Sequence, residues 1–269
     1  MLDWIVPRTD ANSSPVHAPS ATLPPVAVIP ARFGAQRFPG KPLHLIDGVP
    51  MIVRVLDRVR AARRIAWVMV ATDDERIALA VEEAGGEVVM TDPALPSGTD
   101  RVWAAVKDLG AGVVLNVQGD EPLMDPENLD RVAGFLEENP GFQLATIAVP
   151  ITDEREIQNP NNVKVVFADD RSALYFSRSP IPYRRREEPR LATWKHLGLY
   201  GYRKEALERW TKLPPHPLEN AESLEQLRAL AAGMRMAVLP GTGDSIGVDT
   251  PEDASRVEAI IRDRSTGGR

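Results

Sequence analysis

The stretch VAVIPARFGAQRFPGKP, residues 26–42, decides the fold class of this chain. Its first part, Val26 to Ile29, is a short apolar run that Pro30 stops, which is typical of a buried parallel strand. From Pro30 to Pro42, two arginines and a lysine lie among three prolines and two glycines. Such a loop can surround a triphosphate with backbone N–H groups while its cations offset the charge. A solvated basic turn is the alternative, and a Walker A loop is excluded because G-x-x-x-x-G-K-[ST] is absent.

Downstream of this loop, helical and strand patterns alternate with short connections. The expected order is a helix at about 51–63, a strand at 67–71, a helix at 75–84, a strand at 88–90, a helix from residue 98 and a strand at 113–117. This β-α-β-α order predicts an α/β fold, in which a mostly parallel sheet is covered by helices on both faces.

The second half of the chain departs from strict alternation. Strand patterns occur at 144–150, 163–167 and 198–202 with few helices between them, and helices are expected at about 221–232 and 251–264. We expect these strands to extend the sheet and to build a smaller substrate lobe. Residues 1–25 are rich in Pro, Ser and Ala and predict a flexible tail, which leaves 26–269 as a single domain.

Composition limits the function classes. Lys and Arg number 32 against 38 Asp and Glu, for a net charge of −6, which does not match the basic footprint of a nucleic-acid binder. The chain has no cysteine, so disulfides and cysteine-based metal sites or nucleophiles are excluded. It lacks the ~20-residue apolar stretch that a membrane span needs, and its first residues do not match a signal peptide. We therefore expect a cytoplasmic protein.

Polar residues follow the predicted strands at the edge where parallel sheets bind ligands. Thr72 and Asp73 follow the second strand, and capping of the next helix is their alternative role. Asp120 follows the fourth strand beside Gly119 and is a good ligand for a hard cation, although a turn residue would look the same. Asp249 precedes Thr250 and a proline that together suit a helix start. We expect Asp120 and Asp249 to hold Mg²⁺ on a triphosphate.

Several motifs together resemble the 3-deoxy-manno-octulosonate (Kdo) cytidylyltransferase family, also called CMP-Kdo synthetase. They are VAVIPARFGAQRFPGKPL, ATDD, NVQGDEP, YFSRSPIP, HLGLYGYR, LEQLR and GVDTPED, in family order over roughly residues 26–262. The resemblance implies a Rossmann-like α/β domain and a homodimer. It also implies that CMP passes from CTP to the anomeric hydroxyl of Kdo, with release of pyrophosphate, for lipopolysaccharide or capsule synthesis.

The resemblance also assigns site residues by position, several of which have no strong local pattern of their own. It implies a CTP site of Ala31, Arg32, Lys41, Thr72, Asp73, Ser97 and Gln118, and a magnesium site of Asp120 and Asp249. The implied acid-sugar site consists of Arg37, Gln118, Arg178, His196, Tyr200, Glu225 and Gln226. Catalysis would rest on Arg37, Lys41, Asp120 and Asp249, through positioning and electrostatics rather than through an obvious general base.

One departure from the family concerns the first loop, where Ala35-Gln36 stands in place of the Ser-Thr of many relatives. Hydroxyl contacts to phosphate are lost there, and backbone N–H groups could compensate. The alternatives are a cytidylyltransferase for sialic acid or for an 8-amino Kdo analogue, a guanylyl- or uridylyltransferase, and a non-catalytic sugar-nucleotide sensor. A sensor predicts loss of Lys41, Asp120 or Asp249, and all three are present.

Overall fold

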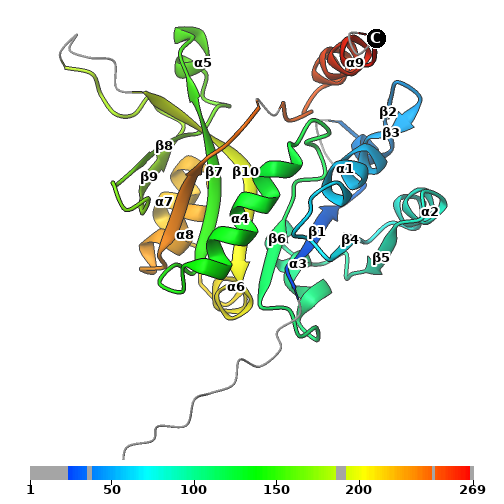
Figure 1. Cartoon of the computed structure of the whole chain (residues 1–269), viewed down its shortest axis with the longest axis horizontal. Coiled ribbons are helices and arrows are strands. Elements are labelled where there is room, and N and C mark those ends of the chain that lie inside the picture. The colour runs from blue at the N-terminus through cyan, green and yellow to red at the C-terminus, as the bar shows by residue number, and fades with distance from the viewer. Residues whose placement is uncertain (1–23, 35–37, 186–191, 244–245, 267–269) are drawn as a thin grey trace, which may run out of the picture.

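The computed structural model describes residues 24–34, 38–185, 192–243 and 246–266. Within these ranges a nine-stranded sheet crosses the molecule, with the order β11-β7-β10-β6-β1-β4-β5 and with β8 and β9 off this path (Figure 1). Four strands of the first half are parallel neighbours: β1 (Val26–Ala31), β4 (Trp67–Thr72), β5 (Glu87–Met90) and β6 (Val113–Asn116). The mostly parallel α/β sheet that the sequence predicts is confirmed.

The second half adds strands of both directions. β7 (Leu144–Ile151) and β11 (Met236–Pro240) are parallel to each other. The long strand β10 (Thr193–Arg203) lies antiparallel between β6 and β7. The first residues of β10 also pair with β8 (Lys164–Phe167), which forms an antiparallel pair with β9 (Ala173–Ser177). β10 therefore joins the main sheet to a smaller lobe.

Helices cover both faces of the sheet because each central strand is apolar on both sides. Ala27 and Ile29 of β1 belong to a core with α1 (Met51–Arg60), α2 (Glu75–Glu83) and α4 (Pro126–Glu138). Val26 and Val28 of the same strand face a second core with α3 (Gly98–Val106), α6 (Lys204–Thr211) and α8 (Gln226–Ala231). This alternation along a strand produces the three layers.

The C-terminal helix returns to the N-terminal part of the chain. α9 (Pro251–Thr266) packs beside the hairpin of β2 (Leu45–Ile46) and β3 (Val49–Pro50), where Ile46, Val248 and Val257 share a third core (Figure 1). Thr250 Oγ1 accepts from the N–H of Asp253 at 3.2 Å, and the Asp253 carboxylate accepts from the N–H of Thr250 at 3.0 Å. The expected helix start at Thr250-Pro251 is confirmed, and it places Asp249 at the carboxyl edge of the sheet.

The helix expected at about 221–232 is wrong as one element. A first helix, α7 (Pro217–Glu222), ends at Glu222, and Ser223 adopts a left-handed conformation with φ 51° before α8 begins. The guanidinium of Arg178 donates to the carbonyls of Glu222 and Ser223, so both carbonyls at this break are hydrogen-bonded. The expectation of few helices between the strands at 144–150, 163–167 and 198–202 is confirmed, since among the described residues only the short α5 (Glu154–Gln158) lies between them. The helices α4 and α6, which precede and follow this stretch, were not expected.

The strand expected at 198–202 extends over 193–203, and β9 and β11 were not expected. Among the described residues, none of the helices is long and apolar enough to cross a membrane. The predicted N-terminal tail lies outside the described residues except for Pro24 and Pro25, so the division into tail and domain stays a prediction.

Candidate active site

A cleft of about 520 Å³ opens at the carboxyl edge of the sheet. Its walls come from the loop after β1, the 3₁₀ turn at Lys41–Leu43, the start of α3 and the loop after β6. Seven of the predicted site residues line it: Ala31, Arg32, Lys41, Ser97, Gln118, Asp120 and Asp249. Because these residues come from segments far apart in the chain, the fold has assembled the phosphate loop and both predicted metal ligands around one space.

Lys41 lies between the two predicted metal ligands. Its Nζ donates to Asp120 at 2.7 Å and to Asp249 at 3.1 Å, and its side chain is 15% exposed. Burial works against the charge of this ammonium, but the two neighbouring carboxylates outweigh burial and raise the pKa of Lys41. The lysine is therefore a firmly charged cation at physiological pH, and Asp120 and Asp249 are close enough to share one cation.

This pair of carboxylates fits the donor set of Mg²⁺. Magnesium prefers oxygen ligands and is usually held by one or two carboxylates together with substrate phosphates and water. The described residues contain no group of three or more His, Cys, Asp or Glu side chains placed to hold a metal ion. A metal here would therefore need oxygens from a bound nucleotide to complete its coordination, as Mg²⁺ does at triphosphates.

Thr72 and Asp73 lie at the end of β4, close to Arg101 of α3. Thr72 is fully buried, and Asp73 accepts from Arg101 at 2.7 Å. Neither residue caps the next helix, because the N-cap of α2 is Asp74, whose side chain accepts from the N–H of Arg76. Arg101 lines the cleft and is only 3% exposed. Asp73 thus acts on the cleft through Arg101, and a direct nucleotide contact of Thr72 or Asp73 stays a prediction.

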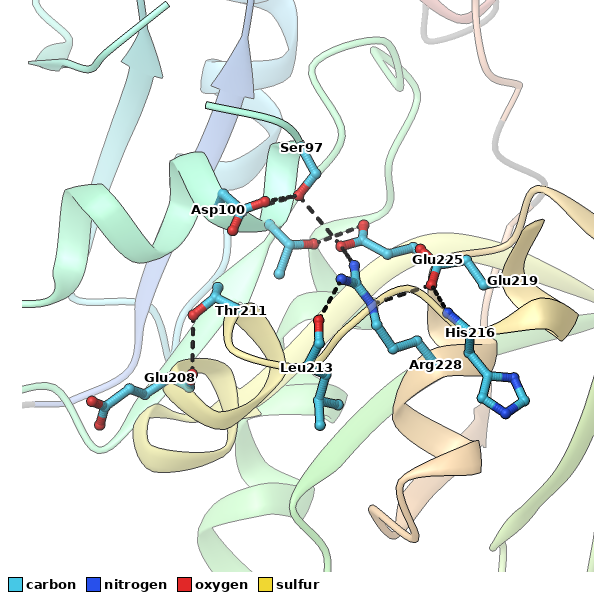
Figure 2. Close-up of polar contacts among 10 residues, drawn as sticks. Ser97, Asp100, Glu208, Thr211, Leu213, His216, Glu219, Glu225 and Arg228 are labelled. Atoms are coloured by element: carbon cyan, nitrogen blue, oxygen red, sulfur yellow. Dashed lines mark hydrogen bonds and ion pairs between the residues drawn. The ribbon is translucent and has the colours of Figure 1, made fainter. Parts of the chain in front are cut away.

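A smaller cavity of about 90 Å³ adjoins the cleft and shares Gly98 and Gln118 with it. Three of the predicted acid-sugar residues line it, namely Gln118, Tyr200 and Glu225. The carboxylate of Glu225 accepts from Thr99 Oγ1 at 3.0 Å and from Arg228 at 2.9 Å (Figure 2). Burial raises the pKa of Glu225 and also raises that of the Tyr200 hydroxyl. The cavity therefore offers polar groups in a poorly hydrated environment.

His196 lines a third cavity, of about 620 Å³, which shares Asp249 with the first cleft. Its Nε2 lies 2.8 Å from Thr146 Oγ1, and its ring packs against Phe176 and Tyr200. Burial lowers the pKa of His196 to about 3. The ring is therefore neutral at physiological pH and can exchange hydrogen bonds with a hydroxyl group without adding charge.

Three predicted residues lie elsewhere or outside the described chain. The Arg178 guanidinium donates to the backbone carbonyls of Pro160, Glu222 and Ser223. Gln226 is 3% exposed at the start of α8, directly after Glu225. Arg37, like Ala35-Gln36, lies outside the described residues. The sugar contacts of these three residues stay predictions.

Sequence reasoning missed Arg101, Thr99 and Arg228. The signal for the first two was present, because Gly98-Thr99-Asp100-Arg101 is a polar first turn on a helix that starts at the ligand-binding edge. Arg228 ends the LEQLR motif, but its local pattern gave no such signal, since a single arginine on a predicted amphipathic helix is usually solvated.

A mostly parallel sheet whose carboxyl edge carries a loop lysine between two carboxylates defines a nucleotide-binding α/β protein of the nucleotidyltransferase type. The family model described as "Cytidylyltransferase" matches residues 26–236. The chain belongs to the cytidylyltransferase family.

Two curated relatives and one solved structure are similar over nearly the whole chain. The 3-deoxy-manno-octulosonate cytidylyltransferase of Desulfatibacillum aliphaticivorans is 48% identical and covers 89% of this chain and 99% of its own. The 8-amino-3,8-dideoxy-manno-octulosonate cytidylyltransferase of Shewanella halifaxensis is also 48% identical, covering 87% and 97%. A structure of CMP:2-keto-3-deoxy-manno-octonic acid synthetase complexed with CTP is 40% identical, with a TM-score of 0.85, covering 90% and 100%. The family resemblance and the fold class are confirmed.

Proposed function

We propose that this protein transfers CMP from CTP to the anomeric hydroxyl of Kdo and releases pyrophosphate. The observation that carries the proposal is the placement of Lys41 between Asp120 and Asp249 in a cleft that adjoins two polar cavities. The family of the chain and the names of its similar relatives support the same reaction.

The nucleotide would lie in the first cleft. Arg32 and Lys41 supply cations for the phosphates, and Ser97 at the start of α3 and Gln118 after β6 supply polar contacts from the wall of the cleft. Ser97 is the N-cap of α3, so the positive end of a nine-residue helix lies at the same wall and favours an anion. Asp120 and Asp249 would hold Mg²⁺, which offsets the charge that develops on the phosphates when it is bound.

The acid sugar would lie in the adjoining cavities, where Tyr200, His196 and Glu225 offer partners for its hydroxyl groups. The anomeric oxygen forms a bond to the α-phosphorus while the bond from that phosphorus to the pyrophosphate oxygen breaks, and the hydroxyl proton passes to water. Lys41 forms ion pairs with both Asp120 and Asp249. Its charge lowers the cost of a developing alkoxide or phosphate anion, so positioning and electrostatics supply most of the rate.

Pyrophosphate release from the purified protein with CTP, Kdo and Mg²⁺ tests this proposal. We expect release only when all three are present, and little release when UTP or sialic acid replaces its counterpart. Asp120→Asn should lower turnover at saturating magnesium by roughly 100-fold or more, because it removes a charged metal ligand. Asp108→Asn, at an exposed carboxylate, is the control. Full turnover of the Asp120 variant would refute the metal assignment.

An 8-amino Kdo analogue is the second candidate substrate. It rests on the relative from Shewanella halifaxensis, whose 48% identity equals that of the Kdo relative. Comparing kcat/KM for the two sugars in the same assay decides between them. The homodimer and the use of the product for lipopolysaccharide or capsule synthesis stay predictions from the family resemblance.

A further inference from the structure

Glu225 connects the nucleotide cleft to the small cavity beside it. Its Oε2 accepts from Thr99 Oγ1 at 3.0 Å, and its Oε1 lies 3.3 Å from Ser97 Oγ, whose single hydroxyl proton is donated to Asp100 Oδ2 at 2.6 Å (Figure 2). Ser97 lines the first cleft, whereas Glu225 and Thr99 line the small cavity. The Glu225 carboxylate, which lies directly before α8, is therefore held across the first turn of α3.

Arg228 supplies the cation of this arrangement. Its Nη2 donates to Glu225 Oε1 at 2.9 Å, and its Nε forms an ion pair with Glu219 Oε2 at 3.3 Å. Its Nη1 donates to the carbonyl of Leu213 at 3.1 Å, and the side chain is 14% exposed. Figure 2 shows the guanidinium between the two carboxylates. One largely buried cation thus serves two acids and is anchored to the backbone.

The second acid belongs to the start of α7. Glu219 Oε2 accepts from the backbone N–H of His216 at 3.1 Å, which forms a capping box at the beginning of this helix. The Glu219 carboxylate is therefore fixed at the start of α7, and Arg228 links the Glu225 carboxylate to it. Without the guanidinium, Glu225 would keep the hydrogen bond from the Thr99 hydroxyl, and its carboxylate would be held less firmly across the cavity.

The charges that face Glu225 come from several elements. Asp100 on α3 and Glu219 on α7 are like charges, Tyr200 and Tyr202 of β10 are neutral hydroxyl groups, and Arg228 on α8 is a cation. Burial, Asp100 and Glu219 raise the pKa of Glu225, whereas Thr99 and Arg228 lower it. Loss of Arg228 would leave a carboxylate in a poorly hydrated cavity among like charges, which disfavours its ionised form.

We propose that Arg228 is a positioning residue for the acid-sugar site, because it holds the carboxylate of Glu225 across the small cavity as an acceptor for sugar hydroxyls. The inference rests on the proposed function for the identity of the ligand. The arrangement of Arg228, Glu225 and Glu219 itself is independent of the ligand.

The first test needs no substrate. The pKa of Glu225 is measured by NMR on protein with ¹³C-labelled glutamate carboxyls, and Glu225→Gln assigns the signal. Arg228→Met should raise this pKa, whereas Glu219→Gln should lower it, since it removes a like charge from the same cation. Arg228→Lys should lie between Arg228→Met and the native protein. Two shifts of opposite sign do not follow from general loosening of α8.

The second test uses turnover. Arg228→Met should raise KM for the acid sugar about tenfold, the order expected for a lost hydrogen bond to a charged group, and Arg228→Lys should restore part of it. The control is Arg209→Met, which removes another arginine, one that donates to the carbonyl of Ala232 at the end of α8.

If the native protein uses no acid sugar, the proposed function fails, while the NMR measurement still tests the role of Arg228. An unchanged pKa of Glu225 in Arg228→Met and Glu219→Gln, or equal KM values for the two arginine variants, would overturn the inference. If Arg228→Met does not fold, Arg228→Lys and Glu219→Gln carry both measurements.

Discussion

The ionisation of His196 depends strongly on where the fold places its ring. Thr146, Phe176 and Tyr200 surround its ring, and burial lowers its pKa to about 3 from an ordinary value of 6.5. The native protein therefore keeps a neutral histidine at pH values where the unfolded chain binds a proton. Protons taken up only by the unfolded chain destabilise the native state as the pH falls.

This difference predicts acid sensitivity that His196→Gln relieves. The folded pKa is depressed, so the contribution of His196 to stability is present above about pH 6.5 and is lost progressively as the pH falls toward 3. The slope from this one group approaches roughly 1.4 kcal/mol per pH unit. Urea unfolding of the native protein and of His196→Gln between pH 5 and pH 8 measures this slope. Near pH 8, where the histidine is neutral in both states, the difference in the free energy of unfolding reports only the contacts that the substitution removes. If the free energy of unfolding changes with pH equally in the variant and the native protein, the His196 ring is not shielded from protonation in the folded protein.

The sequence predicted the residues of the first cleft better than those of the sugar cavities. Lys41, Asp120 and Asp249 were predicted because each lies at or near the end of a recognisable strand or beside a helix start, and such positions meet at one edge of a sheet. Arg178 shows why the rest was harder. A guanidinium has five donors on a long stem, and in this fold it reaches three backbone carbonyls. Which acceptor it finds depends on tertiary packing that a local pattern does not contain.

At the scale of elements, β10 organises the second half of the molecule. It pairs antiparallel with β6, β7 and β8, and it carries both His196 and Tyr200. Alternation of strands and helices predicted the parallel half, because every βαβ unit leaves the same pattern. A later antiparallel strand inserted between two strands that are consecutive in the chain leaves no such pattern. The missed helix α4 differs, because Leu129, Val132 and Leu136 do recur at helical spacing.

Close packing of β10 against α4 depends on Gly201. A Cβ atom at this position would overlap Val132 and lie 2.9 Å from Leu136 Cδ1. Gly201→Ala should therefore lower the free energy of unfolding by about 1–3 kcal/mol, the usual cost of overpacking a core. Gly247→Ala is the matched control, since nothing lies within 4 Å of the added atom there. Urea titration compares them, and equal stabilities would mean that the helix shifts at little cost.

At the scale of the whole molecule, the cleft depends on the meeting of the two ends of the domain. Lys41 comes from the loop after the first strand, and Asp249 lies 208 residues later, just before the last helix. The core shared by Ile46, Val248 and Val257 holds α9 beside the N-terminal hairpin. A ligand that bridges Asp120 and Asp249 would therefore join α9 to the central sheet, so binding and global stability are coupled.

This coupling predicts that CTP and Mg²⁺ together raise the thermal unfolding midpoint. At a ligand concentration 100 times Kd the stabilisation is about 2.7 kcal/mol, which corresponds to roughly 5–10 °C for a chain of this size. EDTA should abolish the shift, because two carboxylates facing a triphosphate without a metal repel it. Asp249→Asn should reduce the shift strongly, whereas Asp170→Asn, at a surface carboxylate paired with Arg235, should keep it. Thermal scans by circular dichroism measure all four conditions. A shift that survives EDTA, or one of equal size in both variants, would show that CTP binds without a metal held by Asp249.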